Sequence, residues 1–222
     1  HIPNLPNFEP GWVWLTGAGP GDPGLMTVLA LHALHEADTV IYDALVSEEI
    51  LALANKNAEL IYAGKRGGKP SPKQLDISHK LISLAREGRR VLRLKGGDPF
   101  IFGRGGEEAL ALVAARIDFR VIPGVSAGVG GLAYAGIPLT HRDTNSAVTF
   151  VTGHNASGIV PDSVDWQSVA KGSDALVVYM PLKHIKQISK MLIDAGRSSN
   201  EPAAVVSKAT TPEQKTVVST LA

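Results

Sequence analysis

Short apolar runs alternate with longer stretches of helical periodicity through the first half of the chain. The runs are rich in Val, Ile and Tyr, and they predict strands at residues 12–16, 39–42, 59–63, 90–94 and 119–122. Apolar positions three and four apart predict helices at residues 25–36, 47–54, 73–87 and 107–115. This alternation is typical of βαβ units, so we expect an α/β fold whose first sheet is parallel.

Pro123-Gly124 interrupts this pattern, and we place a domain boundary there. The expected domains are residues 11–122 and 123–222. In the second domain the sequence predicts a helix at residues 126–135, a helix at 183–195, and strands at 147–152, 174–179, 203–207 and 216–220. A loop is expected between residues 152 and 174. Short strands without intervening helices indicate a mixed second sheet.

The composition limits the classes of protein to which this chain can belong. The chain has 222 residues, of which 44% are hydrophobic and 19% charged, and a net charge of +1. These values predict a globular protein, and the charge does not favour nucleic-acid binding. The absence of cysteine excludes disulfides, thiolate metal sites and a cysteine nucleophile. No apolar run is long enough for a membrane span and the opening residues do not resemble a signal peptide, so we expect a soluble protein.

Histidines give no pattern of metal ligands. His32 and His35 lie three apart on a predicted helix without an acidic partner, and His79, His154 and His184 are isolated. We therefore expect no metal.

The loops at the carboxyl ends of the predicted strands contain the candidate chemistry. Residues 17–23, GAGPGDP, would let a ligand approach the backbone, although they lack the lysine of a phosphate-binding P-loop and a structural tight turn is the alternative. Asp43 follows the second strand and is a candidate proton acceptor. The alternative is that Asp43 starts the next helix, although Ser47 is better placed as the N-cap.

Cations and glycines gather after the third and fourth strands. Lys65, Arg66 and Lys69 lie in a loop that would ordinarily be a solvated surface. Residues 89–95 supply a second basic set, and residues 96–107 then combine many glycines with two acids and Arg104. Such glycine density favours close approach of the backbone to a ligand. Arg142 lies beside a histidine in the segment 138–143, for which a surface turn is the alternative.

Six segments, in this order, resemble the tetrapyrrole methylase family. They are GAGPGDPGLMT (17–27), YDALVS (42–47), GKRGG (64–68), RLKGGDPFIFGRGGEE (93–108), PGVSAG (123–128) and AGIPLTHRD (135–143). The resemblance runs from about residue 12 to residue 208. The long string at 93–108 and the PLTHR segment are most similar to members that methylate uroporphyrinogen III at carbons 2 and 7 to give precorrin-2.

The resemblance implies two α/β domains, with S-adenosyl-L-methionine bound in the cleft between them and S-adenosyl-L-homocysteine formed as product. It also implies a cytoplasmic homodimer. The cofactor positions carried over are Pro20, Gly96, Gly97, Asp98, Ile101, Ser126, Ala127, Met180 and Ala209. Asp43 matches the proposed proton acceptor and Lys65 the proposed proton donor, while Arg104 and Glu107 match catalytic positions. The positions implied to bind the substrate are Arg66, Arg104 and Arg142.

The chain departs from the family pattern in its second half. Pro181 follows Met180 where relatives usually have glycine, and Ser-Lys-Ala-Thr at 207–210 replaces a more usual Glu-Asn-Gly-Thr. Relatives also continue past the position of Ala222, so the second sheet is expected to be incomplete. Two alternatives remain: a sister methylase acting on a later precorrin, and a non-catalytic module that binds an anion or nucleotide.

Overall fold

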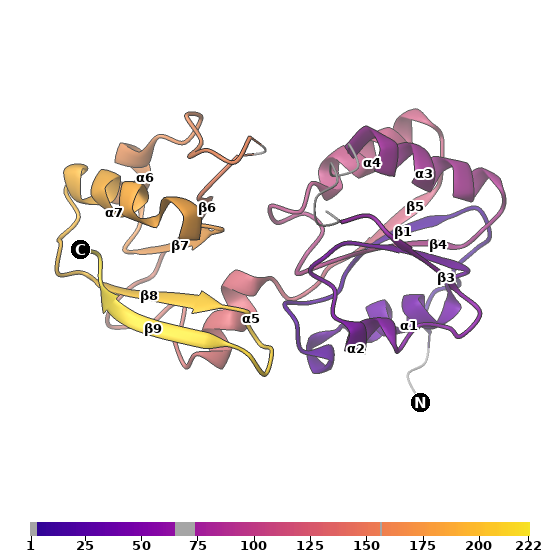
Figure 1. The fold of residues 1–222 in the computed structure, drawn as a ribbon, viewed down its shortest axis with the longest axis horizontal. Coiled ribbons are helices and arrows are strands. Elements are labelled where there is room, and N and C mark those ends of the chain that lie inside the picture. Colours follow the sequence, from indigo (N-terminus) through magenta and orange to yellow (C-terminus); the bar gives the residue numbers. More distant parts are fainter. Residues whose placement is uncertain (1–3, 65–73, 156) are drawn as a thin grey trace. The chain divides into compact units, whose positions relative to one another are not determined.

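The computed structural model describes residues 4–64, 74–155 and 157–222. The chain divides into two compact units, His1–Ala127 and Gly128–Ala222. Both are shown in Figure 1.

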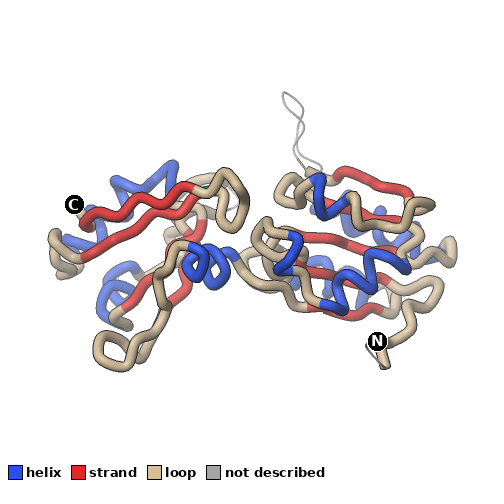
Figure 2. The backbone as a smooth tube through the Cα atoms, turned by 90° about the horizontal axis from the view of Figure 1, so that it is seen from below, coloured by secondary structure: helices blue, strands red, loops and turns tan. Residues whose placement is uncertain are grey.

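The first unit contains one parallel sheet, as the sequence predicted, and its strands lie in the order β3-β2-β4-β1-β5. The strands are β1 (Val13–Gly17), β2 (Thr39–Tyr42), β3 (Glu59–Tyr62), β4 (Val91–Lys95) and β5 (Phe119–Ile122), and they run side by side in Figure 2. Every residue of β1 and β4 is buried. Such two-sided burial is typical of a parallel sheet covered by helices.

Helices cover both faces of this sheet (Figure 1). On one face lie α1 (Val28–Glu36) and α2 (Glu48–Leu51), preceded by a short 3₁₀ turn, η1 (Pro23–Leu25). On the other lie α3 (Gln74–Arg86) and α4 (Gly105–Ala114). The helix α2 begins where the sequence predicted, because the Ser47 hydroxyl accepts a hydrogen bond from the Ile50 amide at 3.3 Å.

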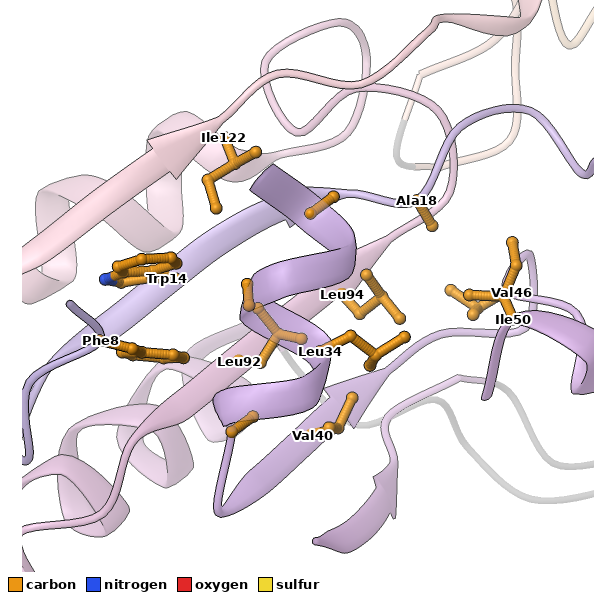
Figure 3. Close-up of a cluster of buried hydrophobic side chains, with 13 residues drawn as sticks. Phe8, Trp14, Ala18, Leu34, Val40, Val46, Ile50, Leu92, Leu94 and Ile122 are labelled. Atoms are coloured by element: carbon orange, nitrogen blue, oxygen red, sulfur yellow. The ribbon is translucent and has the colours of Figure 1, made fainter. Parts of the chain in front are cut away.

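Each face has its own apolar core. The core beneath α1 and α2 includes Trp14, Leu34 and Leu92, and Figure 3 shows the ring of Phe8 stacked on Trp14, with centroids 4.3 Å apart. The core beneath α3 and α4 includes Leu15 and Leu81. The sheet is therefore fixed between two apolar layers, and the loops at its carboxyl edge project from a rigid support.

The second unit contains two strand pairs instead of the single mixed sheet that the sequence predicted, in the part of the chain that the structure describes. β6 (Val148–Thr152) and β7 (Ala175–Tyr179) are parallel, whereas β8 (Pro202–Ser207) and β9 (Lys215–Thr220) form an antiparallel hairpin. All of β9 is exposed. The other elements are α5 (Ala127–Tyr134), α6 (Trp166–Gly172), η2 (Leu182–His184) and α7 (Ile185–Asp194).

The helix α6 corrects the expectation of a loop between residues 152 and 174. Asp165 starts it by accepting hydrogen bonds from the amide and the hydroxyl of Ser168. Trp166 and Ala170 are buried in the core of the second unit. Tertiary burial stabilises this short helix, whose apolar periodicity is too brief to recognise in the sequence.

Candidate active site

The carboxyl ends of the five parallel strands bring the loops singled out in the sequence to one edge of the first sheet. The glycine loop follows β1, Asp43 follows β2, residues 96–104 follow β4 and residues 123–126 follow β5. Open α/β sheets bind their ligands outside this edge. The edge is therefore the candidate active site of the first unit.

Backbone hydrogen bonds hold the glycine loop against the loop after β4. The Gly19 amide donates to the Gly97 carbonyl at 3.2 Å, and the Gly97 amide donates to the Gly19 carbonyl at 2.7 Å. Both residues have positive φ, 78° and 66°, a conformation that favours glycine. Pro20 and Gly96, two predicted cofactor positions, directly adjoin this bridge.

Gly17 and Gly124 leave no room for side chains where the loops meet. A Cβ atom on Gly17 would lie 2.5 Å from the Gly97 carbonyl oxygen and 2.6 Å from the Gly124 amide nitrogen. These neighbours are backbone atoms, so they could move only if the loops separated.

We therefore expect Gly17→Ala to lower the free energy of unfolding by about 1–3 kcal/mol and to weaken binding at this edge, because an overpacked contact displaces the backbone. Chemical denaturation measures the loss of stability, and calorimetric titration with S-adenosyl-L-homocysteine measures the loss of binding. Gly106→Ala is the matched control: Gly106 is exposed within α4 and has open space around its Cβ position, so this change should raise stability by up to about 1 kcal/mol. Equal effects of the two substitutions would contradict the close approach.

Asp98 connects the loop after β4 to the loop after β5. Its Oδ1 accepts a hydrogen bond from the Phe100 amide at 2.8 Å, and its Oδ2 accepts one from the Gly124 amide at 3.0 Å. A carboxylate has about four acceptor positions. Asp98 can therefore hold the loops together and still accept a hydrogen bond from a ligand hydroxyl or ammonium group.

The predicted cofactor positions of the first unit gather around these loops. A Cβ atom on Gly97 would lie 3.8 Å from the Cα of Ser126 and 3.9 Å from the amide of Ala127. The Ile101 amide donates to the Asp98 carbonyl at 3.4 Å. The structure thus brings together Pro20, Gly96, Gly97, Asp98, Ile101, Ser126 and Ala127.

Asp43 lies beside these loops at the end of β2. Its Oδ1 accepts a hydrogen bond from the Leu45 amide at 3.0 Å, and its Oδ2 lies 3.9 Å from a terminal nitrogen of Arg93. The side chain of Asp43 is 24% exposed. Its carboxylate is thus held by the chain yet accessible to a substrate.

Arg93, Lys95 and Glu108 form a buried charged cluster that the sequence analysis did not identify. Arg93 Nε lies 3.0 Å and Lys95 Nζ 3.3 Å from the same oxygen of Glu108, Oε1. The side chains of all three are at most 5% exposed. A signal did exist, because alternation along β4 places Arg93 and Lys95 on one face of a central strand, where burial requires an acidic partner.

Burial lowers the pKa of Lys95 below its ordinary value of 10.5, and the charge of Arg93 lowers this pKa further, whereas Glu108 and Asp43 raise it. Between the folded-state pKa and 10.5, the unfolded chain binds more protons at this position. The contribution of Lys95 to the free energy of unfolding therefore rises with pH through that window.

We expect the difference in unfolding free energy between the unmodified protein and Lys95→Met to increase as pH rises from neutral towards 10.5. Denaturation across this range measures it, and a decreasing difference would contradict the burial of a charged ammonium.

Arg104 and Glu107 pair with one another at the start of α4. The Arg104 Nε and a terminal nitrogen contact the two carboxylate oxygens of Glu107 at 3.0 and 2.7 Å. This hydrogen-bonded pairing raises the pKa of Arg104 and lowers that of Glu107. Both side chains are about half exposed, and Arg104 has a φ of 60°. The pair therefore faces solvent, where it can meet an anionic ligand.

The remaining predicted positions lie elsewhere in the chain. Lys65 and Arg66, with Lys69, fall outside the described residues. Arg142 is an exposed residue in a turn of the second unit. Met180 has a φ of 56°, and its carbonyl lies 3.2 Å from Nδ1 of His154.

Ala209 packs inside the second unit. A Cβ atom on Gly131 would lie 2.7 Å from the Cβ of Ala209, and the Gly128 amide donates to the Tyr179 hydroxyl at 2.9 Å. The glycines of α5 therefore allow close packing within the second unit.

Within residues 4–64, 74–155 and 157–222, no group of three or more His, Cys, Asp or Glu side chains is arranged to hold a metal ion. Across the same residues, no helix is both long enough and apolar enough to span a membrane.

Comparison with known proteins places this chain in a family. The family model described as "Tetrapyrrole (Corrin/Porphyrin) Methylases" matches residues 13–222. A Sinorhizobium protein named uroporphyrinogen-III C-methyltransferase is 61% identical over 98% of this chain and 78% of its own length. A siroheme synthase of Neisseria meningitidis is 50% identical over 97% of this chain, which spans 45% of that protein.

Solved structures give the same result. A uroporphyrin-III C-methyltransferase from Thermus thermophilus, in complex with S-adenosylhomocysteine, is 41% identical with a TM-score of 0.81, over 94% of this chain and 88% of its own. A cobalt precorrin-4 methyltransferase is 30% identical with a TM-score of 0.83, over 95% of this chain and 86% of its own. Both names describe methyl transfer to a tetrapyrrole.

Proposed function

Because the chain belongs to the tetrapyrrole methylase family, we propose that it is the enzyme that transfers methyl groups from S-adenosyl-L-methionine to carbons 2 and 7 of uroporphyrinogen III, yielding precorrin-2. The observation that carries the proposal is the 61% identity to a uroporphyrinogen-III C-methyltransferase over nearly the whole chain. The relatives named siroheme synthase support the same early branch of tetrapyrrole synthesis.

The loops of the first unit fit S-adenosylmethionine. This cofactor has no phosphate group, so a glycine loop without a P-loop lysine suits it. The positive φ of Gly97 and the remaining acceptor capacity of Asp98 fit a ligand held largely by backbone groups. We assign Pro20, Gly96, Gly97, Asp98, Ile101, Ser126, Ala127, Met180 and Ala209 to cofactor binding, the last two from the second unit.

Recognition of the substrate requires cations, because uroporphyrinogen III carries eight carboxylates on the rim of its macrocycle. The chain has a net charge of only +1, so its cations must act locally. Arg104 and Arg142 are exposed and suited to bidentate contacts with carboxylates, and Lys65 and Arg66 are assigned to the same task. Leu45, Phe100 and Phe102 are exposed apolar side chains from the same edge of the first sheet that suit a pyrrole face.

Bound S-adenosylmethionine supplies an electrophilic methyl group on a good leaving group. Alignment of a pyrrole carbon with this methyl contributes up to roughly 7–11 kcal/mol of the catalysis. As the new C–C bond forms, the C–S bond breaks, and the electron-deficient ring loses a proton. We assign this proton to the carboxylate of Asp43, whose hydrogen bond from Leu45 orients it. Lys65, Arg104 and Glu107 are assigned to proton supply and to electrostatic support of these steps.

We extend the proposal to a homodimer in the cytoplasm. The support for both is the resemblance to the family, and the absence of a membrane-spanning helix among the described residues is compatible with it.

The identity of the methyl acceptor is tested by comparing two tetrapyrrole substrates. Labelled methyl transfer from S-adenosylmethionine is measured anaerobically with uroporphyrinogen III and with the same tetrapyrrole after decarboxylation of its acetate groups. The proposal predicts fast transfer to the first and slow transfer to the second, because the cations contact the carboxylates. Transfer to neither of these, but to a later precorrin, would instead favour the sister activity of the precorrin-4 relative.

A further inference from the structure

The charged cluster of Arg93, Lys95 and Glu108 lies directly beneath the candidate active site and takes no part in the proposed reaction steps. Arg93 and Lys95 belong to β4, whose carboxyl end continues into Gly96 and Gly97. Glu108 belongs to the first turns of α4, immediately after Arg104 and Glu107. The cluster therefore links the strand that leads to the cofactor loop with the helix that presents the substrate residues.

A buried cluster of charges is an unfavourable way to stabilise a fold. Buried ion pairs lose hydration that their attraction only partly repays, and apolar residues of similar volume often stabilise a core better. Leu15 and Ile41, which lie opposite Arg93 on the neighbouring strands, belong to the apolar core around these charges. The position of these charges at the carboxyl edge indicates a role in the site.

The contacts of Arg93 determine where its guanidinium points. Nε donates to Glu108 at 3.0 Å, and one terminal nitrogen donates to the carbonyls of Ile41 and Leu94, both at 3.3 Å. The other terminal nitrogen faces Asp43 Oδ2 at 3.9 Å. Three hydrogen bonds therefore fix the guanidinium group of Arg93, and its other terminal nitrogen is directed at Asp43, the proposed proton acceptor.

Asp43 is consequently held from both sides. The Leu45 amide engages Oδ1 and Arg93 faces Oδ2. We propose that Arg93, anchored by Glu108, is a positioning residue that fixes the carboxylate of Asp43 in the orientation needed to accept the substrate proton. This inference rests on the proposed function and adds to it a residue pair that acts through Asp43.

The test is a double-mutant cycle of Asp43→Asn and Arg93→Lys in the full chain. Arg93→Lys keeps the charge but loses the planar fork. We expect the turnover number kcat with uroporphyrinogen III to fall about tenfold to a hundredfold, as when a reacting group is displaced by about 1 Å. The KM for S-adenosylmethionine should change less than twofold. In the Asp43→Asn background, Arg93→Lys should cause no further loss, because the group that it positions is gone.

A second pair of variants separates positioning from stability. Glu108→Asp retains the charge and shortens the anchor, so it should lower kcat in the same non-additive way even if Arg93→Lys does not fold. Arg197→Lys is the matched control: Arg197 pairs with Glu201 and donates to the carbonyls of Ala170, Ser173 and Asp174 in the second unit. It should lower the melting temperature and leave kcat unchanged.

The outcomes are distinct. Losses that multiply in the double variant, or an Arg93→Lys protein with unchanged kcat, would overturn the positioning role while the proposed function stands. An unmodified protein that transfers no methyl group to uroporphyrinogen III would overturn the function and this inference with it.

Discussion

Asp43→Asn is expected to lower kcat for methyl transfer to uroporphyrinogen III by about 10²–10⁴-fold, which is the usual contribution of a positioned acid or base. Asparagine has nearly the same shape and can accept the hydrogen bond that Leu45 donates. It cannot take up the substrate proton, so the chemical step should fail while the fold persists. Steady-state kinetics measures the loss, and calorimetric titration with S-adenosylhomocysteine should give unchanged affinity.

The same strand supplies the control for this substitution. Asp38 precedes β2 as Asp43 follows it, and Asp38 accepts a hydrogen bond from the Arg90 amide at 2.8 Å at the amino edge of the sheet. Asp38→Asn removes the same charge far from the candidate chemistry and should leave kcat unchanged. Full activity of Asp43→Asn would show that another group takes the proton.

Glu108→Gln is expected to cost about 3–5 kcal/mol of unfolding free energy, because it leaves two buried cations without their shared carboxylate. Glu108 is fully buried, and Arg93 and Lys95 both contact its Oε1. Glutamine has the same size, so the loss would report charge and not volume. Chemical denaturation measures the change.

Glu107, which precedes Glu108 in the chain, provides the matched control for this substitution. Glu107 is 55% exposed and pairs with the half-exposed Arg104. Because solvent screens such pairs, Glu107→Gln should cost less than about 1 kcal/mol. Similar losses for the two neighbouring substitutions would contradict the assignment of Glu108 as the buried partner of β4.

The first unit is predictable because its local signals agree with its tertiary structure. Val, Ile and Tyr mark the strands, and Ser47 starts α2 as the sequence indicates. Asp43 can be selected because a parallel sheet gathers the loops after its strands at one edge. The second unit has weaker signals: α6 is short, and it depends on the burial of Trp166 and Ala170, which no local pattern reveals.

For the buried cluster, the sequence pattern indicates which cations share a face of β4 but does not identify their acidic partner. Arg93 and Lys95 stand among other cations between residues 89 and 95, although only alternate positions share a face of β4. Glu108 is one of two adjacent acids, and only the packing of α4 against β4 distinguishes it from the exposed Glu107. Burial, which depends on contacts distant in sequence, decides which charge interacts with which.

The most direct test of the assignment is the mass of the tetrapyrrole recovered after anaerobic incubation of the protein with S-adenosylmethionine and uroporphyrinogen III. The proposed activity predicts a product heavier by two methyl groups, with a singly methylated species at early times. Recovery of unmethylated uroporphyrinogen III, from a protein that binds S-adenosylhomocysteine, would contradict it.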